Sequence, residues 1–251
     1  MSQTIAAETR VGEIAVALPG AARVFEHYGI DFCCGGKKTL RQACLESHLD
    51  AATLLNELEQ AASESSEPSD AHWREQPPRE LIDYIVERHH QYVRSEVPRI
   101  ERWLDKCVAA HGERHQELLT IRHAFEAMAT EMAQHMAKEE LILFPAIHRL
   151  AEPPSPNARP SATCFPSISH PIQMMLLEHE HSGRDLETMR SASGDFTPPP
   201  DACATYRALY EALQDFDRNL RRHVHLENNI LFPRAIALEQ SRGSGAAPAQ
   251  A

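Results

Sequence analysis

The sequence predicts an all-α protein: an up-down four-helix bundle preceded by a small N-terminal helical domain. Four long stretches repeat apolar residues at helical spacing, and three breaks rich in glycine or proline separate them. Helices joined in this order pack as antiparallel neighbours. A histidine–glutamate motif recurs in the second and fourth stretches, which predicts that both face one interior site.

Residues 1–60 predict the small domain, because several short helical patterns follow one another there. The run Asp31-Phe32-Cys33-Cys34-Gly35-Gly36 interrupts these patterns. Two glycines leave the backbone free to adopt positive φ, so we expect an accessible turn. Thiols on such a turn could ligate metal, accept a nitrosyl group or cycle between redox states, and Cys33 and Cys34 are the candidates. The alternative is a pair of buried small residues.

The bundle is predicted over residues 78–240, after a linker rich in Ser, Glu and Pro at residues 61–77 and before a disordered tail at 241–251. Pro98 is expected to bend the first of the four helices. The helical stretches run over residues 78–111, 116–150, 172–189 and 202–238.

The repeated motif pairs an imidazole with a carboxylate. His135 precedes Glu139 by four residues and Ile-Leu-Phe-Pro follows at 142–145; His223, Glu227 and residues 230–233 repeat this pattern. Positions i and i+4 share one helix face, next to an apolar stripe that turns them inward. A single copy is typical of a solvated surface pair, but its recurrence with the same apolar sequence favours a shared site.

Hairpin symmetry extends this site to all four helices, because residues equally far from a turn lie at one level. The midpoint between His90 and His135 falls beside Gly112. That between Glu139 and His179 falls inside the proline-rich segment, and that between His179 and His223 falls just after Pro200. We therefore expect one layer formed by His90, His135, Glu139, His179, His223 and Glu227. His111 follows His90 by about 31 Å of helix and is excluded. A second group of histidines faces other directions on the same helices: His89, His181 and His225.

Four imidazoles and two carboxylates without a thiolate suit iron or manganese better than structural zinc. The arrangement predicts two non-haem iron ions, joined by bridging carboxylates and an oxo or hydroxo bridge. Each ion would lack a full set of six ligands, so the metal would be reactive or releasable. We expect Glu178 or Glu180 to hold the outer nitrogens of the histidines.

Composition excludes several classes of partner. The net charge of −11 and the absence of a basic stripe argue against nucleic acid. No apolar run reaches membrane-spanning length, and the N-terminal apolar stretch lacks the basic start of a signal peptide. Six irregularly spaced cysteines fit reduced thiols in a cytoplasmic protein.

The combination of the Asp31–Gly36 run with the two His-x3-Glu segments resembles the repair-of-iron-centres (RIC) proteins of the ScdA/YtfE type, over residues 10–238. The resemblance implies a cytoplasmic, non-haem di-iron protein that restores iron–sulfur clusters damaged by nitric oxide or oxidants, plausibly by supplying iron. The family's ligands would fall on the six residues of the predicted layer, and some members also carry a histidine at the position of His111. The loop before the third helix, which includes residues 161–169, looks longer than the usual form of this family.

Other functions stay open. Oxygen-carrying hemerythrins place a second histidine four residues after the third-helix ligand, but Gly183 stands there and cannot ligate. Nitric oxide reduction or transfer at the di-iron site, with Cys33 and Cys34 as acceptors, is one alternative. A hemerythrin-like oxygen or nitric oxide sensor is another, although no output domain is attached, and a metal-free bundle is the last. Expected partners are damaged iron–sulfur proteins or a cluster-assembly scaffold, with a homodimer left open.

Overall fold

The computed structural model describes residues 5–65, 69–152 and 165–244. All named elements in these ranges are helical. An isolated β-bridge joins Arg10 and Thr39 and belongs to no strand. The predicted all-α class is therefore confirmed. No helix in these ranges combines the length and apolarity that a bilayer crossing needs. The chain divides into two compact units, residues 82–223 and residues 1–81 with 224–251.

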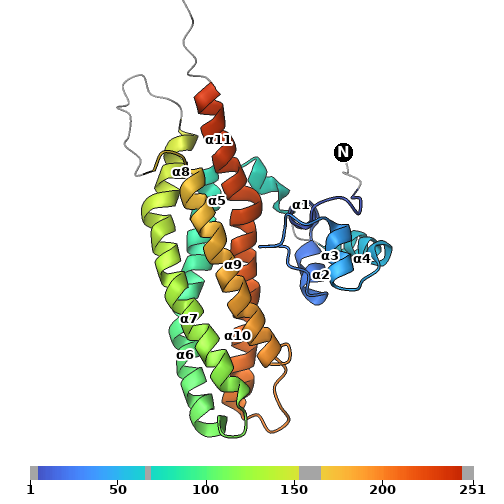
Figure 1. Cartoon of the computed structure of the whole chain (residues 1–251), viewed down its shortest axis with the longest axis vertical. Helices are drawn as coiled ribbons and strands as arrows, with labels where there is room; N and C mark the ends of the chain where they lie inside the picture. Colours follow the sequence, from blue (N-terminus) through green and yellow to red (C-terminus); the bar gives the residue numbers. More distant parts are fainter. Residues whose placement is uncertain (1–4, 66–68, 153–164, 245–251) are drawn as a thin grey trace, which may run out of the picture. The chain divides into compact units, whose positions relative to one another are not determined.

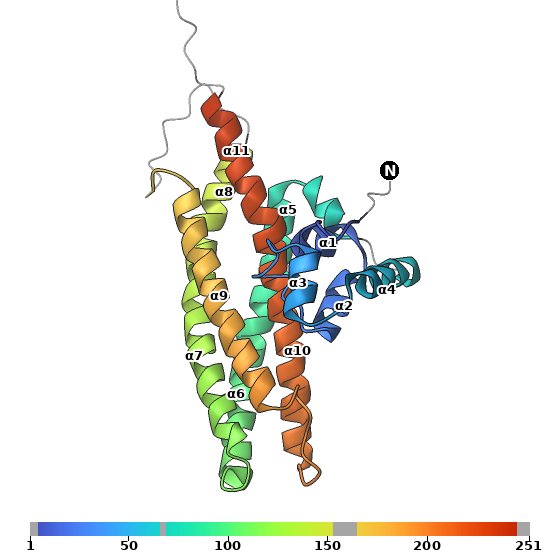
Figure 2. The same ribbon diagram turned by 45° about the vertical axis from the view of Figure 1, so that its right-hand side comes forward.

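The unit of residues 82–223 covers most of the stretch predicted as the bundle. Its successive long helices alternate in direction and run alongside one another (Figure 1), an arrangement that the rotated view repeats (Figure 2). Phe216 lies between Tyr92 and Phe125 at ring-centroid distances of 6.2 and 5.4 Å, so aromatic side chains from three helices fill the core. The helices are α6 (Gln91–His111), α7 (Glu117–Lys138), α8 (Phe144–Ala151), α9 (Ser169–Ala192) and α10 (Ala204–Leu226), after α5 (Pro78–Ile85).

Helix ends differ modestly from the predicted bounds. α9 begins at Ser169 rather than at 172, and Pro171 fits its first turn because the missing N–H would have no partner there. The last helix, α11 (Phe232–Ser244), continues past the predicted start of the tail at 241. Residues 153–164 and 245–251 lie outside the described residues, so the long loop and the rest of the tail stay predictions.

Three π-helical turns interrupt the bundle helices: η2 (Val86–His90), η3 (Glu139–Leu143) and η4 (Glu227–Leu231). Two of them end two residues before a proline, Pro145 or Pro233. Proline lacks an N–H and its ring collides with the carbonyl four residues earlier, and a wider turn relieves that collision. Each of these two turns begins at the glutamate of a His-x3-Glu motif.

The other unit contains the short helices of the predicted N-terminal domain and the chain from Val224 onward. α1 packs on η4, and two caps fix the following helices: a capping box of Thr39 with Gln42, and Asp50. The elements are α1 (Val11–Ala17), α2 (Ala21–His27), α3 (Leu40–Glu46), α4 (Ala51–Glu64) and η1 (Asp70–Arg74). Helix α4 therefore reaches into the stretch expected as a linker, while the domain boundaries themselves stay a prediction.

The side chain of Asn229, in η4, contacts the backbone of the N-terminal helical segments at close range. Its amide donates to the Phe32 carbonyl at 3.1 Å, and Asn228 donates to the Cys33 carbonyl at 3.1 Å. A Cβ atom at Gly12 would lie 2.3 Å from the side-chain oxygen of Asn229, and one at Gly36 would lie 2.7 Å from it. Glycine is required at both positions because any side chain would displace Asn229.

A buried ion pair offers a test of bundle packing. Asp217 is fully buried and pairs with Arg190 of α9 and with Arg221, whose Nε lies 3.0 Å from a carboxylate oxygen. We expect Asp217→Asn to lower the free energy of unfolding by about 3 kcal/mol, because Arg221 and Arg190 lose a buried counter-charge, although Arg190 keeps its pair with Asp195. Urea unfolding followed by circular dichroism measures the change.

The control is Asp215→Asn on the same helix. Asp215 pairs with Arg218 at an exposed position, and an exposed ion pair contributes less than about 1 kcal/mol. Equal effects of the two substitutions would contradict the importance of the buried pair.

Candidate metal centre

Two pairs of histidines meet at one glutamate inside the bundle. The Nε2 atoms of His90 and His223 lie 3.2 Å apart, and those of His135 and His179 lie 3.1 Å apart. A carboxylate oxygen of Glu139 is 3.4 Å from His90 Nε2 and 3.3 Å from His135 Nε2. Glu139 therefore belongs to both groups, and within each group the candidate ligand atoms lie within 4.8 Å of one another.

Each side chain reaches this point from a different helical segment. His90 ends the π turn η2, His135 lies in the last turn of α7, and Glu139 begins η3. His179 comes from α9 and His223 from α10. All five are at most 1% exposed, although each is polar or ionisable. Burial of such groups is costly unless they are paired or bind a metal, so their convergence marks a site.

Carboxylates outside the centre fix two of the rings. Glu178 accepts a hydrogen bond from Nδ1 of His135 at 2.9 Å, and this bond, with Lys138, lowers the pKa of Glu178 to about 2 against the opposing effect of burial. Burial acts to raise the pKa of Glu140, but hydrogen bonds from His90 (2.6 Å) and Arg94 (2.7 Å) outweigh it and lower the pKa. Both carboxylates are therefore ionised acceptors, and each Nδ1 carries the proton.

The state of Nδ1 determines what Nε2 can do. A neutral imidazole with its proton on Nδ1 presents a lone pair at Nε2. The lone pairs of His90 and His135 thus point at other histidine nitrogens and at a carboxylate of Glu139. Without a cation, His223 and His179 would have to meet these lone pairs by donating from their own Nε2 atoms. The convergence of these nitrogens with the buried carboxylate of Glu139 fits a cation-binding centre.

The spacing of the donors agrees with this interpretation. Neighbouring ligands about 2.1 Å from one ion lie about 3.0 Å apart when they subtend a right angle at it. The nitrogen–nitrogen and nitrogen–oxygen distances of 3.1–3.4 Å in the two groups are close to that value. Imidazole and carboxylate donors without a thiolate suit iron or manganese.

Glu227, the sixth residue of the predicted layer, continues the helix that carries His223. The backbone stays helical from α10 through η4, so Glu227 lies about one turn beyond His223, as Glu139 lies beyond His135. Its side chain is fully buried.

The histidines excluded from the predicted layer belong to neither of the two groups, although the ring of His89 stacks on that of His223 at a centroid distance of 5.6 Å. His111 ends α6, where its Nε2 is 3.2 Å from the Cys203 sulfur. His89 approaches Asn219 at 3.1 Å, and His225 approaches Asn229 at 3.0 Å. Of the two glutamates considered as supports, Glu178 contacts His135, whereas Glu180 is exposed. The role of Glu140 has no sequence signal, because it adjoins a ligand candidate and would be expected on another helix face.

The cysteine turn differs partly from expectation. Cys34 is half-buried, but Cys33 is only 4% exposed, so one thiol rather than two is accessible. Asp31 closes the turn by accepting the N–H groups of Cys33 and Cys34 at 3.1 and 2.9 Å, and that of Gly35. The sulfur atoms lie 3.9 Å apart, and Asp31, Cys33 and Cys34 form a group of candidate metal ligands.

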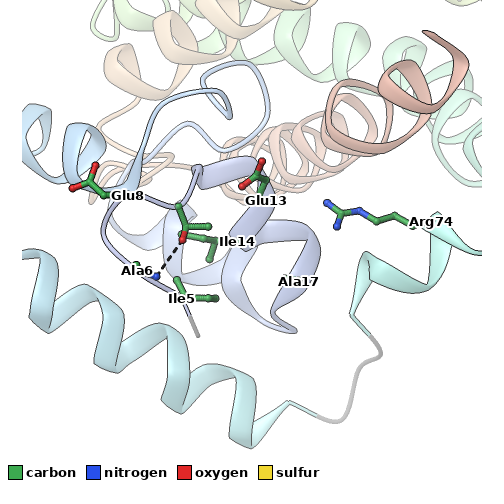
Figure 3. A pocket seen from close by; sticks show the side chains of 8 residues that line it. Ile5, Ala6, Glu8, Glu13, Ile14, Ala17 and Arg74 are labelled. Atoms are coloured by element: carbon green, nitrogen blue, oxygen red, sulfur yellow. Dashed lines mark hydrogen bonds between the residues drawn. The ribbon is translucent and has the colours of Figure 1, made fainter. Parts of the chain in front are cut away.

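A pocket in the N-terminal domain shows no comparable chemistry (Figure 3). Its charged side chains are Glu8, Glu13 and Arg74, and Glu8 already pairs with Arg41. None of its lining residues belongs to the predicted site: Ile5, Ala6, Glu8, Thr9, Glu13, Ile14, Ala17 and Arg74.

Comparison with known families matches both parts of the chain. The family described as the hemerythrin HHE cation-binding domain matches residues 81–235. The ScdA N-terminal family, described as a domain of unknown function, matches residues 7–62. The fold and the buried histidine–glutamate groups therefore define a hemerythrin-like cation-binding protein with an ScdA-type N-terminal domain.

Several curated relatives cover almost the whole chain. A probable iron–sulfur cluster repair protein of Haemophilus influenzae is 34% identical over 92% of this chain and 97% of its own length. The iron–sulfur cluster repair proteins YtfE of Musicola paradisiaca and of Pectobacterium carotovorum are each 37% identical, over 91% and 90% of this chain and 96% of their own lengths. The chain belongs to this family of hemerythrin-like proteins of the YtfE type.

The support of His135 by Glu178 can be tested through metal affinity. Glu178→Ala removes the acceptor that holds Nδ1, and loss of such a partner weakens metal binding by about 10- to 100-fold. Competition with a chelator of known iron affinity measures the change. Glu180→Ala is the matched control, since Glu180 is exposed and two residues away on α9; an equal loss in both variants would contradict a specific role for Glu178.

Proposed function

We propose that this protein repairs iron–sulfur clusters damaged by oxidative or nitrosative stress, and that it acts as an iron donor. The observation that carries the proposal is the meeting of two histidine pairs at Glu139 in a chain whose near-full-length relatives are named for cluster repair. Its partners would be damaged iron–sulfur proteins or a cluster-assembly scaffold in the cytoplasm, with no role for nucleic acid or membrane.

The metal source would be two non-haem irons. We assign His90 and His223 to one ion, His135 and His179 to the other, and Glu139 and Glu227 to bridging positions. The membership of Glu139 in both groups supports a bridge, and the repeat of the His-x3-Glu motif supports the same role for Glu227. Iron bound there would supply redox chemistry and a pool of exchangeable metal.

The surrounding residues would orient the ligands and limit water. Glu140 and Glu178 hold His90 and His135 in the orientation that aims Nε2 at the centre. The ring of Phe144 stacks on His90 at a centroid distance of 5.8 Å, which covers one side of that ligand with an apolar surface. Gly183 offers no further donor on α9, so the set remains at two histidines for each ion, and open coordination positions favour release of the metal.

A second candidate function is transfer of nitric oxide to thiols. The observation that favours it is a pair of hydrogen bonds between the cysteine turn and the helical segment that contains Glu227. Asn228 donates to the carbonyl of Cys33 and Asn229 donates to that of Phe32. A thiol on this turn is tied to the residues that directly follow a proposed metal ligand.

Removal of a bridging carboxylate tests iron donation. We expect Glu139→Leu or Glu227→Leu to reduce bound iron from two ions to less than one per chain and to abolish repair, because each ion would lose an anionic ligand. Iron analysis and the recovered activity of a nitric-oxide-treated iron–sulfur dehydratase are the measurements. Glu180→Leu is the control for a surface change, and normal iron content in both bridge variants would refute the assignment.

Replacement of the turn thiols separates the two functions. In the variant with both Cys33→Ser and Cys34→Ser, the buried ligand set is unchanged, so iron donation should persist at the wild-type rate. Thiol-based transfer of nitric oxide should disappear, because no sulfur remains at the turn. The dehydratase assay, run beside an assay for S-nitrosylation of the chain, distinguishes these outcomes; loss of repair with full iron content would favour the thiol mechanism.

A further inference from the structure

A cysteine and a histidine form a close pair at the end of the bundle where α6 stops and α10 starts. The Nε2 atom of His111 lies 3.2 Å from the sulfur of Cys203. His111 is 9% exposed, whereas Cys203 is exposed to solvent. Cys203 precedes His223 by about 30 Å of helix, so this pair is remote from the proposed iron centre.

The backbone places the Cys203 sulfur at the positive end of a long helix. The carbonyl of Cys203 accepts the N–H of Arg207 at 3.1 Å, the first hydrogen bond of α10, so Cys203 is its N-cap residue. A helix N-terminus favours an anionic group, and thiolates are stabilised there.

The buried side of the His111 ring determines which nitrogen carries its proton. Nδ1 is buried and has no hydrogen-bond partner among the described residues. A proton on Nδ1 would leave a buried donor unsatisfied, which costs more than an unused acceptor. The favoured tautomer is therefore protonated at Nε2, and its N–H donates to the Cys203 sulfur. This N–H therefore points at the atom that would react.

The neighbouring carboxylates are already balanced by cations. Asp201, two residues before Cys203, accepts from His115 at 3.1 Å and pairs with Arg114 at 3.6 Å. The hydrogen bond with Asp201, followed by that with Glu117, raises the pKa of His115, although burial acts in the opposite direction. The positive charge of His115 therefore persists to higher pH and offsets the repulsion that Asp201 would exert on a thiolate.

We propose that Cys203 is a reactive thiol, activated by His111 and by the start of α10, and that its reagents are small hydroperoxides. The thiolate sulfur attacks one oxygen of the peroxide, an S–O bond forms and the O–O bond breaks. Sulfur is oxidised to a sulfenic acid, and the leaving hydroxide takes up the thiol proton to give water. With hydrogen peroxide the balance is one thiol and one peroxide to one sulfenic acid and one water.

The chain supplies two internal comparisons. Burial, together with the nearby Cys203, raises the pKa of Cys107 to about 11, and this side chain is 1% exposed. Cys107 should therefore remain a protonated, unreactive thiol at neutral pH. Cys34 is half-buried on the turn that Asp31 closes, so it represents a second accessible thiol for comparison.

Alkylation of the iron-loaded, full-length protein by iodoacetamide at neutral pH provides the first test. Peptide mass mapping over time gives a rate for each cysteine. We expect Cys203 to react about tenfold faster than Cys34, because a hydrogen bond to an ionised group contributes that much, and Cys107 to stay unmodified. A Cys203 rate no higher than that of Cys34 would overturn the proposal.

Paired substitutions at His111 isolate its contribution. Gln can donate from a position close to that of Nε2, whereas Leu cannot, so His111→Leu should slow alkylation of Cys203 about tenfold and His111→Gln should retain most of the rate. Thermal unfolding checks that both variants fold. An unchanged rate in His111→Leu would exclude activation by the histidine.

Peroxide supplies the final comparison. Dimedone, which traps sulfenic acids, should label Cys203 after exposure of the wild-type protein to hydrogen peroxide and should label it far less in His111→Leu. Because both proteins carry the same iron centre, oxidants produced by iron act equally on both. Equal labelling would therefore contradict the inference. The iron-donation assay is unaffected by any of these outcomes, so the two proposals fail separately.

Discussion

The burial of two histidine pairs beside one carboxylate is the constraint on which the bundle depends. At the centre of residues 82–223, histidine nitrogens lie 3.1–3.4 Å from one another and from the carboxylate of Glu139. A core of hydrocarbon would be more stable than this arrangement in the absence of a cation. The helices therefore hold together a set of buried polar groups that a bound cation would stabilise, and the packing above and below must keep them in place.

That packing has two parts with different physical origins. Apolar and aromatic side chains such as Phe125 and Phe216 fix the spacing of the helices, and the buried Asp217 of α10 ties α10 to α9 through Arg190. Carboxylates at the periphery of the centre act through hydrogen bonds instead. Glu140 and Glu178 determine which nitrogen of a histidine is protonated, so they control the charge distribution of the centre without touching the metal.

The fold and the level of the site could be predicted from the sequence because both follow from periodicity. Apolar spacing defines helices, and residues equally distant from a turn must meet, which is why His90 could be paired with His135 before any coordinates were known. Glu140 could not be found in this way, since regular helix geometry turns it about 100° from Glu139. The sequence offered the burial of Cys33 only as the alternative to an accessible turn, because the turn is fixed by Asp31 and by asparagines nearly 200 residues away.

The π turns change the helix phase within both copies of the repeated motif. A π turn holds one residue more than an α turn, so everything after it is rotated by roughly a quarter of a circle relative to an uninterrupted helix. In both copies this phase change begins at the glutamate and ends at the leucine of the Ile-Leu-Phe-Pro run, two residues before the proline. A single-residue deletion within the eleven-residue block would therefore turn either the histidine and glutamate or the apolar side chains that follow them away from the interior.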